Sequence, residues 1–227
     1  MSTTPPLSDA DRAHLGRAVA LGRRGWGRVH PNPMVGCVLV RDGEVVAEGW
    51  HGEFGGPHAE TVALEAAGPA ARGATAYVSL EPCRHEGKTP ACTRALMTSG
   101  EARVVFGAAD PGAESGGGGA ELARAGIVVV GPVFDLPEAR SLNPAFHHRF
   151  ESALPWVALK LAVSLDGRIA EREGVRTTLS GSESAAAVHT LRAGFDGILV
   201  GGATGRVDDP LLTVRGAVEP RVPPVRI

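Results

Sequence analysis

Four residues of this 227-residue chain carry side chains that together could hold a metal ion and move a proton: His58, Glu60, Cys83 and Cys92. Zinc binds imidazole nitrogen and thiolate sulfur tetrahedrally, and a catalytic zinc site keeps three protein ligands so that water takes the fourth position. One histidine and two cysteines supply such a set. We therefore expect His58, Cys83 and Cys92 to bind zinc and Glu60 to act as the general acid and base.

The order of these residues is that of zinc deaminases of nucleobases, in which H-x-E is followed by P-C-x-x-C and the Glu is not a zinc ligand. Residues 58–60 read HAE and residues 82–83 read PC, but Cys92 follows Cys83 by nine positions. Zinc lowers the pKa of bound water to about 7. The pattern predicts hydrolytic deamination, with Glu60 passing the proton of water to the ring nitrogen and the departing ammonia.

Longer motifs surround these residues. Residues 82–92 read PCRHEGKTPAC and resemble the P-C-x-H-x-G-[KR]-T-P-x-C pattern of the bifunctional riboflavin-biosynthesis deaminase/reductase family. Residues 30–36, HPNPMVG, are similar to that family's H-P-N-P-x-V-G, and residues 49–51, GWH, follow in family order. From Leu159, the run LKLAVSLDGR resembles the opening of the family's reductase domain. The resemblance extends from about residue 12 to the end of the chain.

For the first part of the chain the resemblance implies deamination of 2,5-diamino-6-(5-phosphoribosylamino)pyrimidin-4(3H)-one to 5-amino-6-(5-phosphoribosylamino)uracil. The candidate substrate contacts are Asn32, His51, His85, Lys88 and Thr89. The Asn32 amide offers a donor and an acceptor to a pyrimidine edge, while Lys88 and His85 suit the substrate phosphate. From the residues alone, Asn32 could equally be a turn residue between two prolines, and Lys88 a solvated loop charge.

For the second part the resemblance implies an NADPH-dependent ribosyl reductase. The matching positions are Ala162, Thr178, Thr204 and Asp208 on its cofactor surface and Arg176, Arg192, Leu212 and Arg215 on its substrate side. Thr178 stands where the family has tryptophan, and the family's later glycine-rich phosphate loop and acidic substrate residue are not in this sequence. Because the chain ends at Ile227, where a further strand is expected, we expect the reductase domain to be incomplete. Alternatively, this incomplete domain supports dimerisation and does not catalyse the reduction.

Three other interpretations of the metal pattern stay open. The first is a structural zinc, for which His85 or His51 would be the fourth donor. The second is deamination of another base or nucleoside, against which the long spacing between the cysteines argues. The third is a non-catalytic, zinc-stabilised subunit, against which Glu60 argues because a structural zinc needs no proton shuttle. The remaining cysteine, Cys37, lies in an apolar strand pattern and is expected to be a core residue.

Helices and strands alternate along the chain, which predicts α/β layers. We expect a three-layer α/β/α, cytidine-deaminase-like zinc domain over residues 1–150, and the first part of a dihydrofolate-reductase-like α/β domain over residues 151–227. The predicted helices begin at Ser8 and cover 58–67, 93–98, 137–150 and 183–193; the predicted strands cover 34–40, 44–49, 75–80, 103–106, 127–130, 157–163 and 197–201. Strand 75–80 delivers Cys83 at its carboxyl end, where ligand sites of such sheets lie.

Composition narrows the class of protein further. A net charge of −2 and 4% aromatic residues argue against a nucleic-acid binder. The sequence has no run of about 20 apolar residues, so we expect no membrane span. The first residues lack the basic start and apolar core of a secretory signal. Three cysteines, two of them in a metal pattern, fit a reducing compartment. We expect a cytoplasmic enzyme that acts on a small-molecule substrate, and the family resemblance suggests a homo-oligomer.

Overall fold

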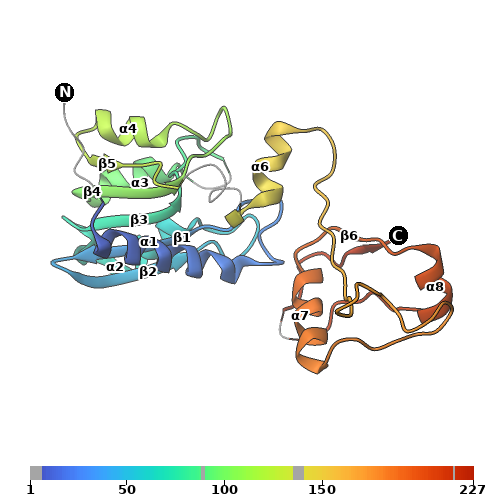
Figure 1. Ribbon diagram of the computed structural model, residues 1–227. Helices are drawn as coiled ribbons and strands as arrows, with labels where there is room; N and C mark the ends of the chain where they lie inside the picture. The colour runs from blue at the N-terminus through green and yellow to red at the C-terminus, as the bar shows by residue number, and fades with distance from the viewer. Residues whose placement is uncertain (1–6, 88–89, 135–140, 217) are drawn as a thin grey trace. The chain divides into compact units, whose positions relative to one another are not determined.

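The computed structural model describes residues 7–87, 90–134, 141–216 and 218–227 (Figure 1). The chain divides into two compact units. The first unit comprises Met1–Gly25 and Pro31–Trp156, and the second comprises Trp26–His30 and Val157–Ile227. No helix within the described ranges is both long enough and apolar enough to cross a bilayer.

The first unit is built on a mixed sheet of five strands in the order β2-β1-β3-β4-β5. The strands are β1 (Gly36–Arg41), β2 (Glu44–Trp50), β3 (Thr75–Leu80), β4 (Arg103–Ala108) and β5 (Val128–Val130). Strand β1 pairs antiparallel with β2 and β3, whereas β3, β4 and β5 run parallel. The carboxyl ends of β3 and β4 therefore meet at one edge of the sheet, where polar residues follow both strands.

Helices cover both faces of this sheet (Figure 1). They are α1 (Asp9–Gly22), α2 (Ala59–Ala67), α3 (Cys92–Ser99) and α4 (Gly118–Arg124), with short 3-10 turns at Arg23–Gly25 and Gly68–Ala71. Helix α6 (Pro144–Glu151) instead packs at the carboxyl ends of β3 and β4, where Phe146 contacts Leu80 and Ala108. Successive strand residues point to opposite faces, so Cys37 and Leu39 of β1 join the core under α2, α3 and α4, while Val38 joins the core under α1. The predicted three-layer arrangement and the core position of Cys37 are confirmed. The predicted helix over 137–150 lies partly outside the described residues.

The amino end of α1 is tied to the sheet by one carboxylate. Ser8 caps the helix, and its hydroxyl and backbone exchange hydrogen bonds with Asp11 in a capping box. The Asp11 carboxylate also accepts hydrogen bonds from Arg103 at 2.6 and 3.2 Å and from the Tyr77 hydroxyl at 2.8 Å. The Arg103 guanidinium, the largest cause, holds the pKa of Asp11 well below its usual range, while burial raises the pKa of Tyr77 to about 12.

We expect Asp11→Ala to lower the free energy of unfolding by about 3 kcal/mol, because it leaves a largely buried guanidinium without its partner. The contribution of Asp11 is present above its unfolded-state pKa of about 4 and is lost as pH falls through its lower folded-state pKa. Urea unfolding should therefore show a difference between wild type and variant that shrinks below about pH 4. Asp9→Ala, in the same helical turn but exposed, is the matched control. Equal effects of the two substitutions would contradict this account.

Helix α2 packs closely against β2 at Gly49. A Cβ at this position would clash with the Ala59 carbonyl oxygen and lie 2.6 Å from the Ala63 backbone nitrogen. The backbone of α2 can approach the strand this closely only because residue 49 has no side chain. The first turn of α2 follows His58 directly, so this contact fixes the position of a candidate zinc ligand.

We expect Gly49→Ala to destabilise the protein by about 2 kcal/mol, since overpacking forces the helix away from the strand, and to weaken zinc retention at the same time. Gly16→Ala is the control, because a Cβ there meets nothing within 4 Å. Thermal unfolding and zinc content after dialysis measure the two effects. If the Gly49→Ala protein is destabilised but retains as much zinc as the wild type, the packing of α2 against β2 does not determine the position of the zinc ligand His58.

The second unit contains helices α7 (Ser182–Arg192) and α8 (Gly202–Asp208), and strands β6 (Gly197–Ile198) and β7 (Val225–Arg226), which pair parallel. Trp26 belongs to this unit and donates a hydrogen bond from Nε1 to the Thr190 carbonyl at 2.7 Å. The predicted helix over 183–193 is confirmed by α7, and the predicted strand over 197–201 is shortened to β6.

The predicted strand over residues 157–163 is wrong. These residues form no strand, and Val157 and Leu159 are each 82% exposed. A strand requires a neighbour that accepts and donates its backbone hydrogen bonds. Within the described ranges, no segment pairs with residues 157–163, so the apolar pattern alone does not produce the strand.

Candidate metal and catalytic site

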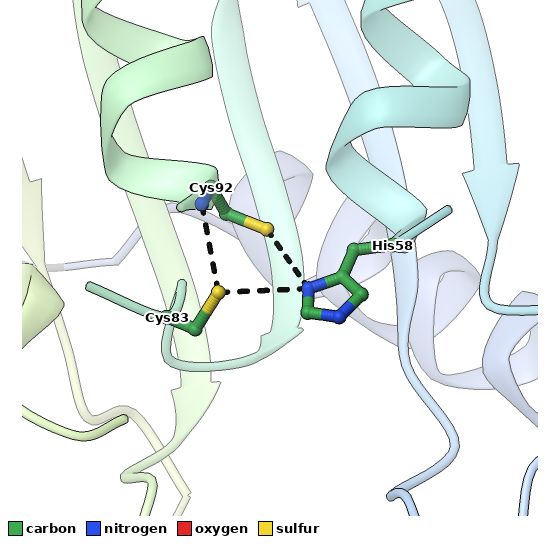
Figure 2. Close-up of side chains that lie close together, drawn as sticks. All are labelled: His58, Cys83 and Cys92. Atoms are coloured by element: carbon green, nitrogen blue, oxygen red, sulfur yellow. Dashed lines mark hydrogen bonds between the residues drawn. The ribbon is translucent and has the colours of Figure 1, made fainter. Parts of the chain in front are cut away.

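His58, Cys83 and Cys92 come together from three different elements (Figure 2). His58 is the N-cap residue of α2, Cys92 is the first residue of α3, and Cys83 follows β3. The Nδ1 atom of His58 lies 3.2 Å from the Cys92 Sγ and 3.5 Å from the Cys83 Sγ. All three ligand atoms lie within 4.8 Å of one another. The structure thus brings together three residues separated by up to 34 positions in the sequence.

The spacing of these atoms fits zinc. Tetrahedral zinc with Zn–S of about 2.3 Å and Zn–N of about 2.0 Å separates nitrogen from sulfur by roughly 3.5 Å. Among the described residues, the group that could hold a metal consists of these three ligands, the number that a catalytic zinc site uses. One imidazole and two thiolates are also the donor types that zinc prefers.

The backbone at His58 explains how residues two positions apart can serve one site. Side chains at i and i+2 of a helix do not face each other. His58 is not helical, however: its φ of −75° and ψ of 161° are extended, and the helix begins at Ala59. Glu60 therefore lies in the first turn of α2, and it lines the same cavity as His58 and Cys83.

Hydrogen bonds shift the protonation of the two thiols in opposite directions. The pKa of Cys83 is lowered because Cys92 donates to its sulfur, with His58 and the Cys92 backbone N–H adding to the effect. The same contact with Cys83 raises the pKa of Cys92, and the bond to Cys83 raises the pKa of His58. A bound metal deprotonates both thiols.

Glu60 is the buried acid of the site. Its side chain is 3% exposed, and burial raises its pKa, against the opposing charge of His58. A carboxyl group with a raised pKa gives up its proton less readily than an exposed one, and a carboxyl group can act as general acid and general base in turn. The arrangement therefore suits an acid and base beside the three ligand atoms.

His51 and Asn32 form a second polar pair. The His51 Nδ1 lies 2.9 Å from the Pro57 carbonyl oxygen, which can only accept, so this nitrogen carries the proton. The His51 Nε2 then accepts from the Asn32 amide nitrogen at 3.2 Å. Burial lowers the pKa of His51, in keeping with a neutral ring. Because both ring nitrogens are engaged, His51 is poorly placed to be a fourth zinc ligand.

A cavity of about 490 Å³ contains these groups. The candidate residues among its lining are His58, Glu60, Cys83, Asn32, His51 and His85. Lys88 and Thr89 lie outside the described residues. The cavity has the size of a site for one small molecule.

Both units match known families. Residues 8–108 match the family described as the cytidine and deoxycytidylate deaminase zinc-binding region, and residues 155–227 match the RibD C-terminal domain. The riboflavin biosynthesis protein RibD of Escherichia coli is 46% identical over 206 residues, which cover 90% of this chain and 56% of that protein. Along 90% of its length, this chain is similar to RibD.

Solved RibD structures share the fold. A diaminohydroxyphosphoribosylaminopyrimidine deaminase/5-amino-6-(5-phosphoribosylamino)uracil reductase from Thermotoga maritima matches with a TM-score of 0.85 and 42% identity. RibD of Acinetobacter baumannii matches with a TM-score of 0.82 and 39% identity. Each match covers 96% of this chain and 62% of the solved chain. The chain thus spans 56–62% of the length of these RibD relatives.

Several residues that line the cavity were not predicted from the sequence. Asp110 follows β4, and burial raises its pKa; the rule that ligand sites lie beyond strand carboxyl ends could have found it. Glu81 follows β3 and accepts hydrogen bonds from the backbone of Asp110 at 3.2 Å and of Gly119 at 2.9 Å. Arg149 and Phe150 reach the cavity from α6, and no local motif signals them.

The region that matches the RibD C-terminal domain brings some of its predicted residues together. Arg192 donates to the Thr213 carbonyl at 3.1 Å, and the Arg215 backbone donates to His189 at 3.2 Å. Burial and the charge of Arg215 lower the pKa of Arg192. The other candidates are distributed over the unit: Arg176 and Thr178 are exposed, Ala162 is half-buried, Thr204 and Asp208 lie on α8, and Leu212 is buried with a φ of 51°.

Proposed function

We propose that this chain catalyses the hydrolytic, zinc-dependent deamination of 2,5-diamino-6-(5-phosphoribosylamino)pyrimidin-4(3H)-one in riboflavin biosynthesis. Water adds to the ring carbon that carries the 2-amino group, the carbon–nitrogen bond breaks, and ammonia leaves. The observation that carries the proposal is the three-ligand cluster with buried Glu60 in one cavity. The deaminase name of the Thermotoga maritima relative supports the choice of substrate.

The proposed roles follow from the positions of the side chains. His58, Cys83 and Cys92 would hold zinc, which when bound supplies a water acidic enough to act as a nucleophile near neutral pH. Glu60 takes one proton from the attacking water and delivers it to the ring nitrogen. It then takes the second proton from the hydroxyl group on the ring carbon and delivers it to the departing amine, so that a carbonyl forms and ammonia leaves. The burial of Glu60 keeps bulk water from competing for these protons.

Asn32 would orient the pyrimidine. Its amide nitrogen is held by His51, which leaves the amide oxygen and the second N–H to contact the edge of the base. His85, Lys88 and Thr89 would contact the phosphoribosyl group.

We further propose that residues 1–150 form the deaminase domain and residues 151–227 part of an NADPH-dependent reductase domain, in a cytoplasmic homo-oligomer. The match of residues 155–227 to the RibD C-terminal domain supports the reductase assignment, and the cysteine usage supports the compartment. Titration of NADPH by fluorescence tests the cofactor. If NADPH does not bind, the proposal that this chain catalyses the reduction is wrong.

Competition among substrates tests the proposed deamination directly. Zinc-loaded protein is incubated with the diaminopyrimidine phosphate, cytidine and guanine together, and each product is quantified by chromatography. We expect the diaminopyrimidine phosphate to react at least about 10²-fold faster than the others, because the site's polar groups are left unpaired by a wrong base. Preferential conversion of cytidine or guanine would replace the proposed substrate, and no conversion at all would favour a non-catalytic subunit.

A further inference from the structure

Arg149 is the one arginine or lysine among the described residues that line the deaminase cavity. Four carboxyl groups, those of Glu60, Glu81, Asp110 and Glu114, line the same cavity. An anionic substrate is repelled by such walls unless a cation faces it. The cationic guanidinium of Arg149 can supply that attraction.

The guanidinium of Arg149 is held in place by neighbours in the first unit. Its Nη1 donates to the Pro31 carbonyl oxygen at 3.1 Å. Its central carbon lies 4.8 Å from the ring centre of Phe150 and 5.4 Å from that of Phe146. A guanidinium has five N–H donors in a planar fork, and the hydrogen bond to Pro31 uses one of them. The remaining donors can make a two-pronged contact with a phosphate, and the aromatic contacts reduce the entropy lost on binding.

Contacts connect Arg149 to the metal end of the cavity through two side chains. Pro31 precedes Asn32, whose amide bonds His51, and the ring centre of His51 lies 5.6 Å from that of His58. Helix α6 is fixed to the same segment, because Asn143 exchanges two hydrogen bonds with the Met34 backbone at 2.8 and 3.0 Å. These contacts run from Arg149 through Asn32 and His51 to His58, and all four side chains line the same cavity. When the 2-amino group of the pyrimidine lies near His58, the phosphoribosylamino group on carbon 6, separated from carbon 2 by one ring nitrogen, can extend along the cavity toward Arg149.

We propose that Arg149 binds the phosphate of the substrate, an inference that rests on the proposed function. This contact makes the deaminase selective for the phosphorylated over the unphosphorylated ribosylaminopyrimidine. The residue acts on binding and not on proton transfer, so its loss raises KM while kcat stays near the wild-type value. Lys88 and His85 are the phosphate contacts that the sequence predicts, and Arg149 would contact the same phosphate from α6.

The test compares four zinc-loaded proteins: wild type, Arg149→Gln, Arg149→Lys and the control Arg124→Gln, whose side chain is exposed on α4. Each is assayed with the phosphorylated substrate and with the same compound lacking its phosphate. We expect Arg149→Gln to raise KM for the phosphorylated substrate about 10- to 100-fold, the worth of a charged hydrogen bond, and to leave kcat/KM for the unphosphorylated compound unchanged. Arg149→Lys should recover part of the loss, because it keeps the charge but not the fork.

Other outcomes overturn the inference. Equal losses on both substrates would mean that Arg149 only supports the packing of α6, and an unchanged KM would mean that the phosphate lies elsewhere; Lys88→Gln, assayed in parallel, then shows whether Lys88 holds it. Binding of ribose 5-phosphate, measured by calorimetry on the same proteins, decides the question without turnover. If wild type binds it more than about 10-fold tighter than Arg149→Gln but deaminates nothing, the proposed function fails and the phosphate site stands. Equal binding by the two proteins removes the phosphate site.

Discussion

Replacing Glu60 by glutamine should lower kcat for deamination by about 10³-fold or more while zinc content stays at the wild-type level. General acid–base catalysis contributes roughly 10²- to 10⁴-fold, and here one residue serves both proton transfers. The glutamine amide has the shape of the carboxyl group but cannot take the proton of the attacking water. Glu60 is not among the three ligand atoms that lie together, so the metal should stay bound. Steady-state rates and elemental analysis on the same samples measure the two effects.

Glu65→Gln is the matched control for this change, because Glu65 lies on the same helix, α2, but is exposed. It should keep both activity and zinc. The account fails if Glu60→Gln retains more than about a tenth of the wild-type kcat, since a loss below 10-fold is smaller than acid–base catalysis provides. Loss of zinc together with activity would instead indicate that Glu60 stabilises the metal site.

Cys92→Ala should lower the affinity for zinc by roughly 100-fold or more and reduce deamination to background. Changes to groups that only orient a ligand already cost about 10- to 100-fold in metal affinity, and this substitution removes a ligand itself. It also removes the hydrogen-bond partner of Cys83, so the remaining thiol loses the contact that lowers its pKa. Competition with a chromogenic zinc chelator measures the affinity.

Cys37→Ala separates this effect from the general loss of a buried thiol. Cys37 is also fully buried, but it lies in β1 within the apolar core and outside the ligand group. The variant should lose some stability through the cavity it creates while keeping zinc and activity. Equal zinc affinity in Cys92→Ala and Cys37→Ala would exclude Cys92 as a ligand.

The metal site could be predicted from the sequence because its signal is local. Residues 58–60 and 82–83 each form a short motif, and the strand that ends at Leu80 places Cys83 at an edge where ligand sites lie. A shared site for His58 and Glu60 requires His58 to stand at the start of the helix, and the structure shows it as an extended N-cap residue. The sequence pattern required His58 and Glu60 to serve one site, but it did not specify the backbone conformation that allows this.

The missed features depend on distant partners. Arg149 reaches the cavity from a helix that is tied to residues about 110 positions earlier, by the hydrogen bonds between Asn143 and Met34. No motif around Arg149 encodes that contact. The predicted strand over 157–163 was wrong because strand formation also depends on a distant partner. Its apolar residues fit a strand, but the described residues provide no neighbouring strand that pairs with it. Local patterns predict what a segment favours, and tertiary contacts decide whether it forms.

Mass spectrometry of the diaminopyrimidine phosphate, after incubation with zinc-loaded protein in ¹⁸O-labelled water, tests the central claim most directly, with Glu60→Ala as the control. We predict that the wild type replaces the 2-amino group by one labelled oxygen and releases ammonia, and that Glu60→Ala binds zinc but leaves the substrate unchanged. An unchanged substrate in the presence of zinc-loaded, folded wild-type protein would contradict the assignment of this cavity as a pyrimidine deaminase site.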